Sequence, residues 1–211
     1  LLMAASQNID AALATFTTSQ VELPASFVKE FALLAGQQGS DAALRPVVQQ
    51  WVAQLTGEKR VAALENLAQV AVGLSKRKQT LASLLQPESA SAQTLLSASL
   101  LSAQQEQASL EERTAAVRLL GYSSISADQL RQLWQANRLA ALREPLVVAC
   151  DLKLDGASWG FLLDEIRKQS PVVRQAIVQG TLRQTERVSQ LLDRLEQQQL
   201  AVVDIDPLSA D

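Results

Sequence analysis

The sequence predicts an all-α fold built from short helical hairpins. Apolar residues return at helical spacing along most of the chain, and β-branched residues never form long alternating runs. Glycine and proline are sparse, at 8 and 6 of 211 residues. Hydrophobic residues make up 47% and aromatic residues 4%, so the core is expected to consist mainly of Leu, Val and Ala. A chain of this length can bury a sizeable core without metal or disulfide cross-links.

The most completely specified helix is expected between Ser109 and Gly121. Ser109 and Glu112 have the spacing of a capping box, in which each side chain accepts a backbone N–H of the other residue. Ser126 and Gln129 repeat this spacing and open a second helix close behind the first. Two short helices joined by a tight turn form a hairpin, and most of the chain shows variations on this pattern.

Six helical stretches are expected in the first half of the chain. Pro24 suits a first helical turn because its missing N–H would have no partner there, and Gly36 and Gly39 are expected to end the helix that follows. The next helix begins near Asp41 or, if the proline is its first residue, near Pro46. The expected stretches are 1–18, 24–36, 41–55 or 46–55, 61–71, 76–85 and 88–105.

The second half continues with shorter helices. A longer connection is expected over 136–145, and Pro145 is expected to open the next helix. Asp155 is an expected N-cap, and Ser170 followed by Pro171 is a typical cap-then-proline start. About ten to twelve helices are expected in all, from the hairpin pattern and typical helix lengths.

Two glycines test the helix register. Gly121 follows the last turn of its helix, where a residue of positive φ is common, so we expect a left-handed conformation there. Gly180 lies within the apolar period of a helix over 171–183, so a negative φ is expected, together with tolerance of alanine provided the site has room for a methyl group. The last helix is expected over 185–199, and the tail over 202–207 has no helical pattern.

The hairpins recur unevenly, at intervals shorter than the roughly 40 residues of typical HEAT units. A single hairpin cannot bury its apolar stripe, so neighbouring hairpins must stack. We therefore predict a degenerate HEAT-like α-solenoid. Its N-terminal hairpins cover 1–108, its C-terminal hairpins continue over 109–207, and 208–211 form a tail.

The composition argues against several classes of function. The net charge is −3, which weighs against a nucleic-acid surface because phosphate binding draws on clustered Lys and Arg. With no histidine, the chain lacks the commonest metal ligand and the usual general base at neutral pH. No apolar run reaches the roughly 18 residues that suggest a membrane span. We expect no cofactor, no metal and no transmembrane segment in this chain.

Four acidic residues, Asp151, Asp155, Asp164 and Glu165, could form a carboxylate pair for acid–base chemistry. The structural alternative is stronger, because Asp155 caps a helix and Asp164 and Glu165 are expected on its exposed face. No catalytic residue is therefore assigned.

The single cysteine and the three tryptophans also have two interpretations. Cys150 is expected to be a buried inert thiol, because no histidine could activate it as a nucleophile. Trp51, Trp134 and Trp159 could line a ligand groove, but one tryptophan per hairpin more often fills the space between helix layers.

Five basic residues form a possible interaction surface: Lys76, Arg77, Lys78, Arg118 and Arg174. The first three make the only basic run, which is typical of a solvated surface but could contact phosphate or lipid headgroups. Arg118 and Arg174 each follow a valine in similar helices. They either pair with acids of a neighbouring repeat or line an inner surface that holds a partner.

The second half of the chain carries a recognisable set of motifs. Arg113-Thr-Ala-Ala-Val-Arg-Leu-Leu-Gly121 is similar to an R-x-A-A-V-R-L-L-G helix. A closing pattern follows with Trp159, Ser170-Pro-Val-Val-Arg174, Arg187, Leu191-Leu-Asp193 and Ile205 between Asp204 and Asp206. These motifs resemble the HEAT-like helical region of PVC-type haem-binding, "membrane-bound dehydrogenase" proteins of planctomycete-like bacteria. The resemblance covers about 109–207, and residues 1–108 agree in character only.

The resemblance implies a larger parent protein with a sugar-dehydrogenase-type β-propeller, this helical region and a c-type haem domain. The haem-attachment motif C-x-x-C-H is absent here, so any haem belongs to other parts of that parent. The chain begins with Leu1-Leu2 inside a helical pattern, and we expect it to be a fragment. An extracytoplasmic (periplasmic) location is implied because c-type haem is attached outside the cytoplasm.

The first functional hypothesis is a non-catalytic helical scaffold that positions the propeller and cytochrome domains of an electron-transfer protein. The second is a free-standing α-solenoid that binds a peptide or a protein. A third, a HEAT-like nucleic-acid glycosylase, needs a basic concave groove and conflicts with the charge balance. The expected partners are thus neighbouring domains or another protein, and not nucleic acid.

Overall fold

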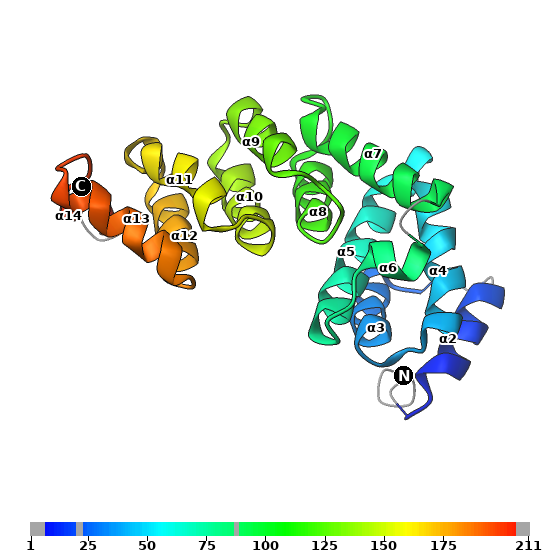
Figure 1. Cartoon of the computed structure of the whole chain (residues 1–211). Helices are drawn as coiled ribbons and strands as arrows, with labels where there is room; N and C mark the ends of the chain where they lie inside the picture. Colours follow the sequence, from blue (N-terminus) through cyan, green and yellow to red (C-terminus); the bar gives the residue numbers. More distant parts are fainter. Residues whose placement is uncertain (1–6, 20–22, 87–88, 206–211) are drawn as a thin grey trace. The chain divides into compact units, whose positions relative to one another are not determined.

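The computed structural model describes residues 7–19, 23–86 and 89–205, and these residues are all-helical (Figure 1). They form thirteen α-helices and two 3₁₀ helices, with no strand among them. The all-α prediction is confirmed. The chain divides into two compact units between Ser124 and Ile125. Leu1-Leu2, Pro87 and the expected tail at 208–211 lie outside the described residues.

The helices of unit 1, which ends at Ser124, contact one another in two series. One series runs from α2 through α4 to α7, and the other from α3 through α5 to α8. The elements are α2 (Ile9–Thr18), α3 (Ala25–Gln38), α4 (Asp41–Ala53), η1 (Gln54–Thr56), α5 (Arg60–Lys76), α6 (Leu81–Leu85), α7 (Ala90–Gln104) and α8 (Leu110–Leu120). Because α8 packs on both α5 and α7, the compact unit extends past the expected division at 108/109.

The most extensive helix contact in unit 1 joins α3 and α5. It is centred on two glycines, Gly36 and Gly73, whose backbones meet with no side chain between them. Gly36 therefore lies inside α3 and does not end it, contrary to expectation. Gly39 does end the helix, since its N–H donates to the carbonyl of Ala35.

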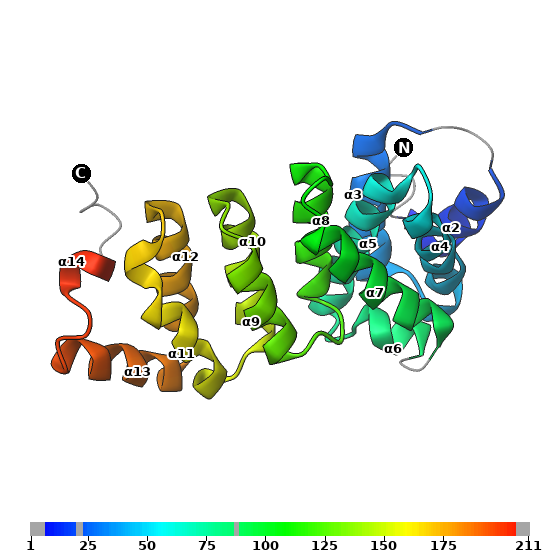
Figure 2. The same ribbon diagram turned by 90° about the horizontal axis from the view of Figure 1, so that it is seen from above.

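Unit 2, from Ile125 onward, is a smaller helical array. α9 contacts α10 and α11 contacts α12 (Figure 2), while α10 also contacts α12 and α11 also contacts α13. The elements are α9 (Ala127–Ala136), α10 (Ala140–Lys153), α11 (Gly156–Asp164), η2 (Ile166–Lys168), α12 (Pro171–Thr181), α13 (Thr185–Glu196) and α14 (Val202–Ile205).

A tryptophan and an arginine occur together twice in the core of unit 2. Trp134 is buried beneath the guanidinium of Arg143, at 4.4 Å from the ring centroid, and Trp159 beneath that of Arg187, at 4.1 Å. Each indole N–H has a partner: Trp134 donates to Glu165 and Trp159 to the hydroxyl of Thr181, both at 2.9 Å. These two tryptophans fill the core, as the structural interpretation expected.

Prolines lie inside two helices where the sequence suggested helix starts. α10 begins at Ala140, so most of the expected connection over 136–145 is helical and Pro145 is the sixth residue of the helix. α4 begins at Asp41 and contains Pro46 at the same position. A proline at this position removes only one backbone hydrogen bond, and that bond lies close to the N-terminus of the helix. Burial of Pro145 and of the apolar residues after it outweighs that loss.

Three other expected boundaries differ in detail. The stretch 76–85 is divided, because α5 continues to Lys76 and Lys78 then adopts a positive φ of 59° before α6 begins. The tail contains the short helix α14, closed by a hydrogen bond from the Ala201 N–H to Asp204. At Ser170 the helix starts as expected, but the hydroxyl makes no capping bond.

The left-handed conformation expected at Gly121 is wrong, whereas at Gly180 the negative φ is confirmed and only the tolerance of alanine is wrong. Gly121 has φ −58° and ψ −20°, an ordinary right-handed conformation, because the chain continues through a hydrogen-bonded turn after α8. A Cβ on Gly180 would lie 2.6 Å from Cη2 of Trp159, so the site has no room for alanine. Tertiary packing, not backbone conformation, is what requires glycine at 180.

The two predicted capping boxes have different outcomes. Ser126 and Gln129 form the complete reciprocal pair. Ser109 accepts the N–H of Glu112, but the Glu112 carboxylate turns away and pairs with Arg60 of α5 at 2.9 Å.

No helix in the described part of the chain is long and apolar enough to cross a membrane.

Candidate binding groove

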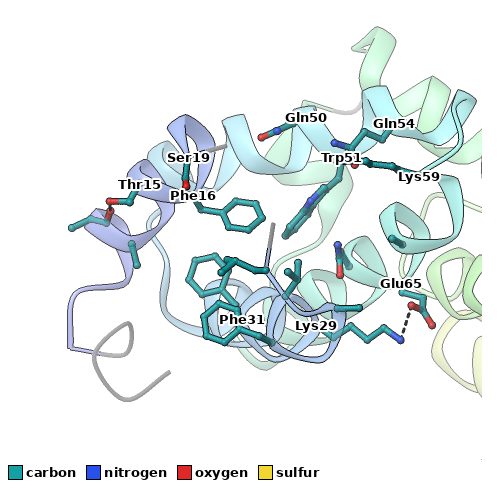
Figure 3. A pocket seen from close by; sticks show the side chains of 18 of the residues that line it. Thr15, Phe16, Ser19, Lys29, Phe31, Gln50, Trp51, Gln54, Lys59 and Glu65 are labelled. Atoms are coloured by element: carbon teal, nitrogen blue, oxygen red, sulfur yellow. Dashed lines mark hydrogen bonds and ion pairs between the residues drawn. The ribbon is translucent and has the colours of Figure 1, made fainter. Parts of the chain in front are cut away.

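A groove of about 930 Å³ opens in unit 1 among α2, α3, α4 and α5 (Figure 3). The side chains around it are mainly apolar and aromatic, with amide and hydroxyl groups between them. They are Asn8, Ala11, Ala12, Thr15, Phe16, Ser19, Leu23, Ala25, Phe27, Val28, Lys29, Phe31, Gln50, Trp51, Gln54, Lys59, Ala62, Glu65 and Asn66. The size and apolar lining are typical of sites that bind ligands or side chains of a partner.

Four aromatic rings form the floor of the groove. The ring of Phe16 lies 5.4 Å from that of Phe31 and 5.8 Å from that of Trp51, while Phe27 stacks on Phe31 at 6.1 Å. Phe31 and Trp51 are only 2% and 3% exposed, whereas Phe16 and Phe27 are half-buried. Figure 3 shows Phe16, Phe31 and Trp51 converging on the groove from three different helices.

The rim of the groove carries little net charge. Lys29 and Glu65 pair at 2.6 Å and neutralise each other. Gln50 and Gln54 lie one helical turn apart along one wall, and Lys59 follows on the same side (Figure 3). Lys59 is exposed and forms no ion pair with the described residues. The groove can therefore bind an apolar surface and offer a single cation beside it.

The four carboxylates considered for catalysis serve different partners. Asp151 pairs with Arg187 at 2.6 Å, Asp164 pairs with Arg194 at 2.8 Å, and Glu165 accepts the indole N–H of Trp134. Asp155 caps α11 as expected, and hydrogen bonds from the backbone and side chain of Ser158 lower the pKa of its carboxyl. Glu165 is thus half-buried and bonded, not on a free exposed face.

Cys150 is buried in α10, as the sequence indicated. Burial raises the pKa of its thiol to about 12, partly offset by the nearby charge of Arg187. The thiol is therefore protonated at neutral pH, and a protonated buried thiol is a poor nucleophile.

The five basic residues singled out from the sequence differ in their surroundings. Arg77 donates to the carbonyls of Gly36 and Gly39 and pairs with Asp41, so it fixes the end of α3. Lys76 and Lys78 are exposed. Arg118, in unit 1, lines a small hollow of about 280 Å³ with Glu65 and Leu110, and Arg174 lies half-buried in unit 2. A shared interaction surface of these five stays a prediction.

Sequence reasoning identified Trp51 as a possible groove residue but missed its phenylalanine partners. A compositional signal was present, since three of the four phenylalanines in the chain are Phe16, Phe27 and Phe31. Within a chain whose core is mostly aliphatic, such clustering marks a local aromatic site.

The chain matches no protein-family model, no curated protein and no solved structure. Function is therefore inferred from the groove, the helix packing and the chemistry of the side chains.

Proposed function

We propose that this chain is a non-catalytic helical-repeat protein that binds a polypeptide partner in the groove of unit 1. The aromatic floor of that groove carries the proposal. Phe16 and Phe27 remain half-exposed over the buried rings of Phe31 and Trp51. Partly exposed aromatic side chains beside a buried apolar base are typical of binding hot spots, because a partner's side chains exclude water from them.

The helix contacts support a HEAT-like α-solenoid as the architecture behind this function. Within unit 1, α2, α4 and α7 form one series and α3, α5 and α8 a second; within unit 2, α10 packs on α12 and α11 on α13. Contacts between alternate helices are what stacked hairpins produce. The series are uneven, since the short helix α6 interrupts the first unit, in keeping with a degenerate repeat.

The bonding of the acidic side chains and of Cys150 supports a non-catalytic role. The carboxylates of unit 2 hold helices together through Arg187, Arg194 and Trp134. The polar groups that line the groove are amides, hydroxyls, the ion pair of Lys29 with Glu65 and the side chain of Lys59, which can bind and orient a partner.

A display selection of random peptides on the purified chain tests the binding function. Selected peptides should lose at least about tenfold in affinity with Phe27→Ser, because truncating an aromatic anchor has a large effect on binding. Leu182→Ser is the matched control, since it removes an apolar side chain that is 63% exposed in unit 2. Peptides that bind Phe27→Ser and wild type equally would place the binding site elsewhere.

The setting of the chain is proposed from the resemblance over 109–207. In that setting it is the helical scaffold between a propeller and a c-type cytochrome domain of an extracytoplasmic dehydrogenase-like protein, and partners would be those domains. The gene on either side of this sequence provides the test. A C-x-x-C-H motif encoded downstream supports the scaffold, and native termini at 1 and 211 favour a free-standing α-solenoid that binds a peptide or protein.

A further inference from the structure

We infer that the occupant of the groove is a single amphipathic helix of a partner protein, with large apolar side chains on one face and an acidic side chain beside Lys59. This inference rests on the proposed polypeptide-binding function and specifies the conformation and charge of the ligand. Three features of the groove lead to it: the bonding state of its walls, the packing pattern of its helices and the distribution of charge on its rim.

Most of the groove wall offers no backbone groups to an extended peptide. In the interior of its helices the N–H and C=O groups are paired internally, and the described residues contain no strand edge. Unpaired N–H groups lie in the first turns of α3 and α5, which have no side-chain cap. The floor consists of the four aromatic rings, among which only the indole N–H of Trp51 is a hydrogen-bond donor. An extended segment would bury unpaired backbone groups there. A helix satisfies its own backbone and presents side chains alone to the floor.

The packing of unit 1 also favours a helix. The groove is lined by α2 and α4 on one side and by α3 and α5 on the other, and each of these pairs is in contact. Each series extends by adding a helix against the previous pair, because one helix pair cannot bury its apolar surface alone. A partner helix that lies across these four elements buries the exposed edges of Phe16 and Phe27 in the same manner.

The charge on the rim of the groove favours an acidic ligand. Lys29 and Glu65 neutralise each other at 2.6 Å, so Lys59 is the charge that remains on the groove within the described residues. Lys59 stands at the N-terminus of α5, whose first turn contains no acidic residue. A cation is unfavourable at the positive end of a helix dipole, so Lys59 does not serve the stability of α5. A carboxylate on the flank of the bound helix would offset that charge.

Two display libraries test the inference on the whole chain. The first contains helix-forming 16-residue peptides with Leu, Phe, Met or Trp varied along one face and Glu, Gln or Lys varied on the flanks. The second has the same composition with a central proline, which interrupts a helix. Binders are expected from the helical library only, with Glu enriched at one flank position, and each should gain helicity by circular dichroism when bound.

The remaining outcomes separate failure of this inference from failure of the proposed function. Binders from the proline library alone would overturn the helix and leave polypeptide binding intact. If neither library binds but 1-anilinonaphthalene-8-sulfonate binds and Phe27→Ser abolishes it, the site takes a small apolar molecule and both proposals fail. Self-association that Phe27→Ser abolishes would identify a second copy as the occupant and overturn the inference.

Should Phe27→Ser not fold, Gln50→Trp replaces it, because Gln50 is exposed and a larger side chain there fills the groove.

A charge exchange tests the position of the acid. Lys59→Glu should weaken a selected Glu-bearing peptide about two- to fivefold and strengthen its Lys counterpart by a similar factor, as expected for an exposed ion pair. Lys76→Glu, an exposed lysine at the other end of α5, should change neither affinity. Equal responses to the two substitutions would show a general charge effect and would overturn the contact with Lys59.

Discussion

Gly36 of α3 and Gly73 of α5 lie against each other without an intervening side chain. A Cβ on Gly73 would lie 2.7 Å from the Cα of Gly36 and 2.5 Å from the carbonyl oxygen of Leu33. Both neighbours are backbone atoms, which cannot move aside without shifting the helix. The closest helix pair of unit 1, and with it two walls of the groove, therefore depends on the absence of two side chains.

We predict that Gly73→Ala lowers the free energy of unfolding by about 1–3 kcal/mol, as overpacking of a tight core does. Urea denaturation measures the change. Gly57→Ala is the control, because a Cβ there would lie 3.8 Å from the nearest atom, the carbonyl oxygen of Gln54, and its backbone is extended. A Gly73→Ala protein as stable as wild type would mean that α3 and α5 separate easily.

Gly180→Ala is predicted to destabilise unit 2 by about 1–3 kcal/mol. Its Cβ would lie 2.6 Å from the indole of Trp159, a rigid ring buried on all sides. Gly160→Ala provides the comparison, since its nearest neighbours are the flexible ends of Arg194 and Gln190 at 3.1 and 3.2 Å. Thermal melts should separate the two variants clearly, and equal melting temperatures would contradict the packing of Trp159 on α12.

Replacement of Arg187 by methionine should cost about 3–5 kcal/mol, because it leaves the Asp151 carboxylate without its buried partner. Arg187 is 0% exposed, pairs with Asp151 at 2.6 Å and donates to the carbonyls of Leu154 and Gly180. Arg183 also pairs with Asp151, but its side chain is 66% exposed. Arg183→Met should therefore cost below about 1 kcal/mol, and chemical denaturation that finds equal losses would refute this division of roles.

Cys150 should react with a disulfide reagent such as DTNB at pH 8 only as fast as the protein unfolds. Burial raises the pKa of the thiol from 9.0 to about 12, which lowers its thiolate fraction roughly a thousandfold at pH 8. The unfolded thiol loses its proton at lower pH than the folded one, so this group destabilises the fold progressively between pH 9 and 12. Labelling as fast as in urea-unfolded protein would show that Cys150 is accessible.

Several features of the fold could be predicted because they depend on residues close in sequence. The caps at Ser109, Ser126 and Asp155 form as expected, since a capping bond spans only three residues. The buried state of Cys150 followed from its place on an apolar helix face. The start of α10 differs from the expected one because Pro145, expected to open the helix, is its sixth residue, and burial of the residues around it outweighs one lost backbone bond.

The sequence by itself determined the all-α class, most helix positions and the apolar face of each helix, because helical periodicity and capping are local properties. Only the tertiary structure decided what each face meets. It placed Trp159 against Gly180, turned Glu112 toward Arg60, and brought Phe16, Phe31 and Trp51 together from three helices. Helical periodicity predicts which side chains are buried, but the residues that they contact depend on how helices far apart in the sequence cross. Those crossings produced both the closed core of unit 2 and the open groove of unit 1.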